Sequence, residues 1–92
     1  MISFLDVITR AGDVTLDLAE VVIPPESAIA GKKLSEVKIP ERTGLIILAL
    51  KRRDGAKFKF NPGSGEVIRV GDTMVVLGTR EQEETLEKLV NQ

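Results

Sequence analysis

Hydrophobic and polar positions divide the chain into short elements, most of which have the pattern of strands. Residues 13–18 alternate between polar and apolar, which predicts a strand or an extended linker. This extended segment continues through an apolar triplet until two prolines at 24–25 end it. Residues 45–50 are apolar at odd and even positions alike, the pattern of a strand buried on both faces. Residues 73–77 predict a second buried strand.

Turn residues join these segments into hairpins. The Arg-Asp-Gly sequence at 53–55 predicts a tight turn, because Asp-Gly suits the positive φ angles of a primed turn. Lysine and phenylalanine alternate over residues 57–60, which predicts a half-exposed partner strand. Asn-Pro-Gly at 61–63 predicts another turn, and residues 67–70 predict a short edge strand.

Helical spacing is present in three segments. Residues 3–10 predict a short helix that stops at Gly12. A second helix begins near Lys32 and is closed by Pro40. The last helix has the strongest pattern, since Thr79 caps it and Gln82 completes a capping box. Its apolar stripe consists of Leu86, Leu89 and Val90. The order of elements predicts an α+β fold, in which a small mixed or antiparallel β-sheet packs against short helices.

Composition and charge exclude several classes of function. Ninety-two residues allow one small domain. A formal net charge of −1 gives no basic surface for nucleic acid. The absence of His and Cys excludes zinc fingers, thiol nucleophiles and imidazole-based triads, so we expect no metal site. The longest apolar run, 45–50, is far shorter than the ~20 residues of a membrane span, and no signal peptide is visible. We expect a soluble, cytoplasmic domain.

Catalysis has little support in the sequence. Without His or Cys, a catalyst would use carboxylates, a lysine or a Ser-Lys pair. Ser27 with Lys32 or Lys33 could form such a pair, but a capping serine and solvated lysines explain these residues better, because the sequence supplies nothing else that such a site needs. The Gly-Ser-Gly segment at 63–65 lacks the Lys-Ser/Thr of a phosphate-binding loop and has the composition of a turn. We therefore expect no enzymatic activity.

The apolar content exceeds what three short helices can cover. Strands buried on both faces need cover on both sides, and these helices shield only one side well. An uncovered apolar sheet face usually marks a partner surface, so we expect a dimer. The alternative is that the N-terminal segment folds back over this face.

A set of segments in a specific order resembles one known family. They are residues 21–24, 27–37, 44–52, 61–62 and 71–78. Together they resemble the TrkA C-terminal domain, also called RCK-C, of potassium channels and potassium-uptake regulators. The family often has Pro where this chain has Ala28, a difference confined to a turn. On this basis residues 19–92 form the TrkA-C regulatory domain, and residues 1–18 form an N-terminal helix and connector.

The resemblance implies a regulatory function on the cytoplasmic side of a potassium channel or a Trk/Ktr-type uptake system. Such domains pair as homodimers through their sheets, and in some members cyclic di-AMP binds at the dimer interface. The implied partners are the membrane subunit of the transporter or an upstream nucleotide-binding domain, called RCK-N, which nothing in this chain resembles. The alternative is a purely structural oligomerisation module without a small-molecule ligand.

The resemblance also indicates a ligand site. An Ile-Ile pair followed by an arginine resembles the residues near the cyclic di-AMP pocket of nucleotide-responsive members. The apolar pair would flank the bases, and the arginine would contact a phosphate with its planar fork. The hairpin adds one phenylalanine and an Asn-Pro pair. The candidate ligand-binding residues are therefore Ile46, Ile47, Arg52, Phe58, Asn61 and Pro62. The alternative is that the isoleucines are ordinary core and the arginine is a solvated strand end.

Overall fold

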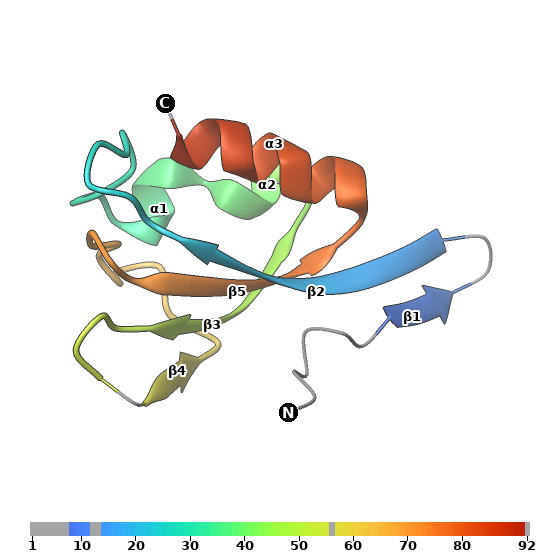
Figure 1. The fold of residues 1–92 in the computed structure, drawn as a ribbon, viewed down its shortest axis with the longest axis horizontal. Coiled ribbons are helices and arrows are strands. Elements are labelled where there is room, and N and C mark those ends of the chain that lie inside the picture. Colours follow the sequence, from blue (N-terminus) through green and yellow to red (C-terminus); the bar gives the residue numbers. More distant parts are fainter. Residues whose placement is uncertain (1–7, 12–13, 56, 92) are drawn as a thin grey trace.

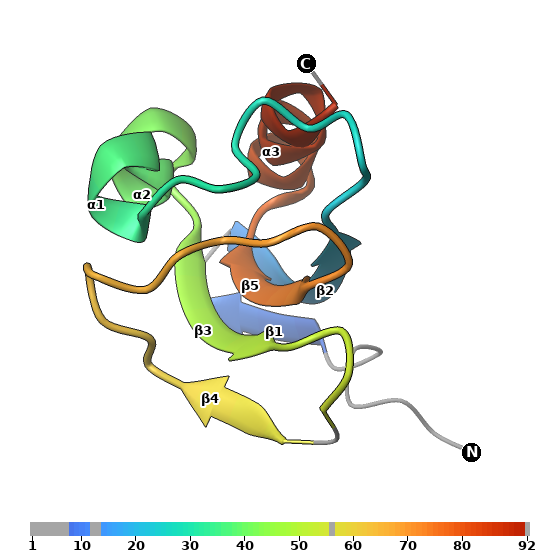
Figure 2. The ribbon, with the colours of Figure 1, turned by 90° about the vertical axis from the view of Figure 1, so that its left-hand side faces the viewer.

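One antiparallel sheet with helices on one of its faces makes up the fold (Figures 1 and 2). The computed structural model describes residues 8–11, 14–55 and 57–91. The strands in this part are β1 (Ile8–Ala11), β2 (Val14–Val22), β3 (Ile46–Lys51), β4 (Phe58–Phe60) and β5 (Thr73–Gly78), and the helices are α1 (Leu34–Val37), α2 (Ile39–Thr43) and α3 (Arg80–Val90). The strands are ordered β1-β2-β5-β3-β4, and every neighbouring pair is antiparallel. The expected α+β fold is confirmed.

Strand register decides which side chains face the helices. Met74 pairs with Val21 on one side and with Leu50 on the other, so the three side chains point to the same face of the sheet. They join one buried cluster with Leu86 and Val90 of α3. Burial of each such aliphatic side chain contributes about 1.5–3 kcal/mol to folding. Figure 2 shows the helices together on this side of the sheet.

The capping box of α3 is present as expected. The Thr79 side chain accepts a hydrogen bond from the Gln82 backbone N–H at 3.3 Å, and the Gln82 side chain accepts one from the Thr79 N–H at 2.9 Å. These two bonds satisfy amides that have no partner within the helix. The helix start is therefore set by side chains close in sequence.

The N-terminal helix prediction is wrong where it can be checked. Residues Ile8–Ala11 form β1 and pair with β2, with Ile8 opposite Asp17. Residues 3–7 and Gly12 lie outside the described residues. A helix of this length is marginal by itself, whereas the edge of β2 offers a ready partner strand. Strand β2 also runs from 14 to 22 without a break, across the expected boundary between residues 18 and 19.

Two further predictions need correction. Pro40 does not close a helix but lies in the first turn of α2, where proline loses no helical hydrogen bond. The backbone turns instead at Lys38, which has a φ of 58°. Residues 67–70 do not form a strand, and Val67 makes only an isolated bridge to Lys33. The segment that leads to β5 is therefore held by individual backbone hydrogen bonds and not by the repeated pairing of a β-strand.

Candidate functional site

A groove runs along the edge of the sheet where β3 loses its neighbour. Strand β4 pairs with β3 only over Ala49–Lys51, so in the described part of the chain no strand adjoins residues 46–48 on that side. The groove has a volume of about 410 Å³ and combines apolar with polar surface. Its lining residues are Leu34, Ser35, Lys38, Pro40, Glu41, Ile47, Pro62 and Ser64.

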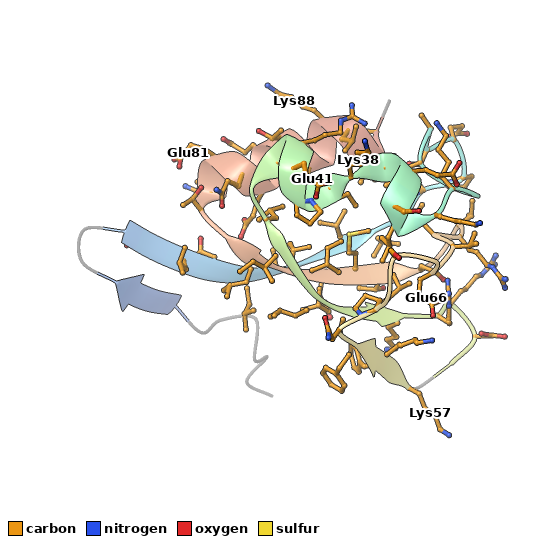
Figure 3. The ribbon with its side chains drawn as sticks, turned by 180° about the vertical axis from the view of Figure 1, so that it is seen from behind. Lys38, Glu41, Lys57, Glu66, Glu81 and Lys88 are labelled. Carbon is orange, nitrogen blue, oxygen red and sulfur yellow. The ribbon has the colours of Figure 1, made fainter. Side chains whose placement is uncertain are left out.

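The two short helices form one wall of this edge groove. Lys38 lies between them in the left-handed conformation, which is uncommon for a residue with a side chain, and its N–H donates to the Leu34 carbonyl at 3.0 Å. This turn ends α1 and begins α2 with a change of direction. Lys38 and Glu41 consequently both reach the groove from the helical side (Figure 3).

The loop between β4 and β5 forms the opposite wall. Asn61 leaves β4 with a φ of 49°, and its N–H donates to the Leu48 carbonyl at 2.8 Å. Two backbone bonds then tie the loop to α1: Ser35 N–H to Ser64 O at 3.0 Å, and Leu34 N–H to Glu66 O at 2.9 Å. Figure 2 shows this loop passing α1 on its way to β5. The groove walls are therefore joined by hydrogen bonds along one side.

The groove offers a mixed set of contacts. Ile47 and Pro62 supply apolar surface, and Lys38 supplies a cation. The two serines supply hydroxyls, and the Glu41 carboxylate supplies an acceptor. Such a lining suits a small ligand that has an apolar part and polar groups able to donate and accept hydrogen bonds.

Arg52 lies outside the groove, in a cluster of charged side chains. Its Nη1 donates to the Val67 carbonyl at 2.7 Å and to Asp72 Oδ2 at 2.6 Å, and its Nη2 donates to Glu66 Oε2 at 2.5 Å. Asp72 is only 1% exposed and also accepts the Arg69 N–H at 2.9 Å. From the sequence, Arg52 is expected either to contact a ligand or to be a solvated strand end. In the structure its guanidinium instead binds carboxylates of its own chain.

Glu66 connects this cluster to β4. It forms ion pairs with Lys59 and Arg52 at the same time. The hydrogen bond from Lys59, with the positive charges of Lys59 and Arg52, lowers the pKa of Glu66 from its ordinary value. Glu66 is therefore a carboxylate at neutral pH and holds the loop against the β3–β4 hairpin.

The sheet face opposite the helices carries a second hollow, which is almost wholly apolar. It also measures about 410 Å³, and its lining residues are Leu18, Leu48, Ala49, Phe58, Phe60 and Val75. The two phenylalanine rings lie 5.9 Å apart between centroids, and Phe60 is 74% exposed. No helix in the described part of the chain covers this face (Figure 1). We call it the open face.

The structure divides the six predicted ligand residues among these places. Ile47 and Pro62 line the edge groove, Phe58 lines the hollow of the open face, and Arg52 belongs to the ion cluster. Ile46 is 57% exposed and pairs with Leu77. Asn61 shapes the turn between β4 and the loop. The expectation that all of β3 is buried on both faces is therefore wrong at its start, because nothing in the described chain covers Ile46.

Sequence reasoning missed the polar lining of the groove. The pattern assigns Ser35 and Lys38 to a helix and Ser64 to a turn, and it assigns no element to Glu41. The left-handed turn at Lys38 and the backbone bonds between α1 and the β4–β5 loop bring them to one groove, and the sequence around a lysine does not predict such a turn.

The part of the chain that the structure describes contains no cluster of three or more potential metal ligands. Among the same residues, none of the helices has the length and apolar character needed to cross a bilayer.

Comparisons with known proteins agree with this architecture. The chain is 33% identical over 75 residues to the "Probable potassium channel protein 2" of Methanocaldococcus jannaschii. The match covers 82% of this chain and 21% of that protein, so the chain spans about a fifth of its relative.

Solved structures of two proteins show similar folds. The RCK_C domain dimer of S. agalactiae BusR in complex with c-di-AMP has a TM-score of 0.74 and 26% identity, covering 80% of this chain and 95% of that one. BusR has also been solved with its busAB-promotor DNA, where the match covers 35% of the BusR chain. The GsuK channel has a TM-score of 0.70 and 28% identity, covering 82% of this chain and 13% of that one.

The sequence model of the TrkA-C domain family matches residues 18–91, from the second half of β2 to the end of α3. This range includes the edge groove, the ion cluster and the residues that line the hollow of the open face. The chain belongs to the TrkA-C domain family.

Proposed function

We propose that this chain is the ligand-binding regulatory domain of a potassium channel or a Trk/Ktr-type uptake system, located on the cytoplasmic side. It works as a homodimer, and a cyclic dinucleotide bound in the edge groove changes the geometry of that dimer. The membrane subunit or an upstream nucleotide-binding domain is its partner. The similarity to potassium channel proteins and to a c-di-AMP-bound dimer supports this assignment. The edge groove, which Ile47 and Pro62 line, is the observation that carries it.

The second copy approaches β3 from its free edge. Such an approach covers the exposed Ile46 and the nearby hollow of the open face, and removes apolar surface from water. A two-fold axis beside β3 also brings the edge grooves of both copies together. Each half of a symmetric ligand then meets the same residues from opposite subunits.

Cyclic di-AMP is the leading candidate ligand. Its bases stack on Ile47 and Pro62, and the Lys38 ammonium lies within reach of a phosphate. For binding to regulate transport, the ligand must bind one dimer geometry more tightly than the other. Equal affinity for the two geometries would not shift the equilibrium between them.

A structural oligomerisation module is the second candidate. The hollow of the open face is lined by apolar side chains and needs no ligand to explain it. Such a module would assemble subunits through the same face and leave the edge groove empty.

Titration calorimetry with cyclic di-AMP separates the two candidates. We expect one ligand per dimer, and we expect Lys38→Gln to weaken binding about tenfold or more, as loss of a charged hydrogen bond does. Lys88→Gln on α3 is the matched control, an exposed lysine outside the groove that should keep the wild-type affinity (Figure 3). A wild-type dimer that binds no nucleotide would support the structural module, and a monomer at micromolar concentration would contradict both candidates.

A further inference from the structure

Positive charge is concentrated at one end of the sheet, although the chain as a whole is nearly neutral. Residues 51–59 hold five of the thirteen basic residues and one of the fourteen acidic residues. The rest of the chain holds eight basic and thirteen acidic residues, which gives the net charge of −1. The excess of positive charge therefore lies in the β3–β4 hairpin, from the last residue of β3 to the middle of β4.

Two of the five hairpin cations are neutralised by carboxylates of the same chain. Arg52 is paired with Glu66 and Asp72, and Lys59 is paired with Glu66. The remaining cations are Lys51, Arg53 and Lys57. None of these three forms an ion pair within the described part of the chain. Their charge is therefore available to a partner outside the domain.

The turn before β5 adds a fourth cation beside the hairpin. The Arg53 side chain lies over Gly71, where a Cβ atom would be only 2.5 Å from Arg53 Cδ. Arg69, two residues before Gly71, is exposed and forms no ion pair with a described residue. Gly71 thus allows the hairpin to pack closely against the turn that carries Arg69. We call Lys51, Arg53, Lys57 and Arg69 the basic end.

The last row of the sheet adds apolar surface to the basic end. Its members, opposite one another across β2, β5, β3 and β4, are Val22, Thr73, Lys51 and Phe58. Directly opposed residues point to the same face, here the open face. Val22 is 60% exposed, and Lys51 Nζ lies 5.6 Å from the centroid of the Phe58 ring. Cations beside exposed apolar side chains are the combination that binds the head-group region of anionic bilayers.

The proposed dimer and its ligand use other surfaces. Ile46 begins β3 and Lys51 ends it, so the dimer contact and the basic end lie about 17 Å apart along the strand. None of the four cations of the basic end lines the edge groove. The basic end consequently stays accessible when the groove is occupied.

We propose that the basic end docks this domain on an anionic lipid bilayer. This inference rests on the proposed function, because that function places the chain beside the cytoplasmic leaflet, whose anionic lipids attract lysine and arginine side chains. The four cations come from a strand, from the hairpin and from a separate turn. Long side chains spread in this way suit many mobile head groups, whereas a single small anion requires donors that converge on one place.

Cosedimentation with lipid vesicles measures the docking. The wild type should bind vesicles of equal parts phosphatidylglycerol and phosphatidylcholine, should not bind phosphatidylcholine vesicles, and should be released at high salt. Arg53→Gln combined with Lys57→Gln should weaken binding to the anionic vesicles about thirtyfold, since each removed charge costs about fivefold. Both side chains are exposed, so the double variant should fold as the wild type does.

Arg80→Gln combined with Lys88→Gln is the matched control. It removes one arginine and one lysine, both exposed on α3, and changes the net charge equally. Figure 3 shows Lys88 on the opposite side of the molecule from Lys57. The control should bind the anionic vesicles as the wild type does. Equal weakening in the two double variants, or a wild type that does not bind anionic vesicles, overturns the inference.

Two further measurements identify the partner and separate this inference from the proposed function. Binding to soluble polyglutamate without binding to vesicles would assign the basic end to an acidic protein partner and overturn the lipid docking. In calorimetry, the Arg53→Gln, Lys57→Gln variant should bind cyclic di-AMP with wild-type affinity, because neither side chain lines the edge groove. Nucleotide binding without vesicle binding would defeat the docking alone, and vesicle binding without nucleotide binding would defeat the proposed ligand site alone.

Discussion

At the scale of single residues, Asp72 has the most constrained environment in the candidate site. It is 1% exposed, yet it accepts hydrogen bonds from the Arg52 guanidinium and from the Arg69 backbone. A buried carboxylate is tolerated because these partners compensate its charge. The Arg52 side chain is only partly buried, with 31% of it exposed to solvent.

Asp72→Asn should therefore destabilise the protein. The substitution keeps the shape of the side chain but removes the charge that pairs with Arg52. We expect a loss of about 2–3 kcal/mol in the free energy of unfolding. This loss is smaller than the full cost of breaking a buried ion pair, because Arg52 reaches solvent. Urea denaturation measures this loss. Asp54→Asn in the exposed turn is the matched control and should have little effect. Equal stability of the two variants would contradict the role of Asp72.

The role of Arg52 shows which residue properties the sequence reveals and which it does not. Its position after a strand and beside a hairpin is readable from the local pattern. Its partners Glu66 and Asp72 are 14 and 20 positions away and belong to an irregular loop. No periodicity relates such residues, so their meeting depends on the tertiary fold. The same reason explains why Lys38 was not predicted in the groove.

At the scale of elements, the strong patterns predicted β2, β5 and α3 correctly. Each has a strong local pattern: polar–apolar alternation in β2, a short apolar run in β5, and the capping box of Thr79 and Gln82 in α3. The errors lie where two local states compete closely. Residues Ile8–Ala11 pair as a strand because β2 supplies a partner, and Pro40 begins a helix because its first turn needs no N–H.

Helix α3 carries a carboxylate in an unfavourable place. One oxygen of Glu83, Oε1, is buried without a hydrogen-bond partner. Burial, followed by the nearby negative charge of Asp17, raises the pKa of Glu83 from its ordinary value. The folded state consequently binds the Glu83 proton more tightly than the unfolded state does, and this residue favours folding less as the pH rises through its folded pKa.

Glu83→Gln should stabilise the protein at pH 7. The amide removes the charge repulsion, and since the carboxyl group is only partly buried we expect a gain of only about 0.5 kcal/mol, or about 2–4 °C in Tm. The gain should vanish once the pH falls below the ordinary pKa of a glutamate, where the carboxyl is protonated in both states. Calorimetric melting at pH 7 and pH 3.5 tests this. Glu84→Gln on the exposed side of α3 is the control, and a gain of equal size there would argue against a special environment at Glu83.

At the scale of the whole molecule, the described residues cover the sheet on one side only. The helices bury Met74 and Leu50, while the other face presents Phe60 and the start of β3 to solvent. The apolar excess in the sequence indicated such a face. The exposure of Ile46 at the start of β3 could not be predicted, because it depends on where β4 stops pairing and not on the composition of β3 itself.

The proposed dimer makes a specific prediction about this edge. Ile46 is 57% exposed in the single chain, so Ile46→Lys should change the stability of the subunit little. In the dimer the same side chain lies in the interface, and a lysine there places a charge against apolar surface. We expect a dissociation constant raised roughly thirtyfold or more, the equivalent of losing a hot spot worth ~2 kcal/mol.

Val22→Lys is the matched control for this experiment. Val22 is 60% exposed and equally apolar, but it lies at the end of β2, two strands away from β3. Sedimentation velocity over a range of micromolar concentrations should show a dimer for the wild type and for Val22→Lys, and mostly monomer for Ile46→Lys. The reverse result, with dissociation caused by Val22→Lys alone, would move the interface to the β2 side and separate it from the edge groove. A symmetric ligand could then no longer bridge two grooves, so the oligomer measurement also tests how the ligand would act.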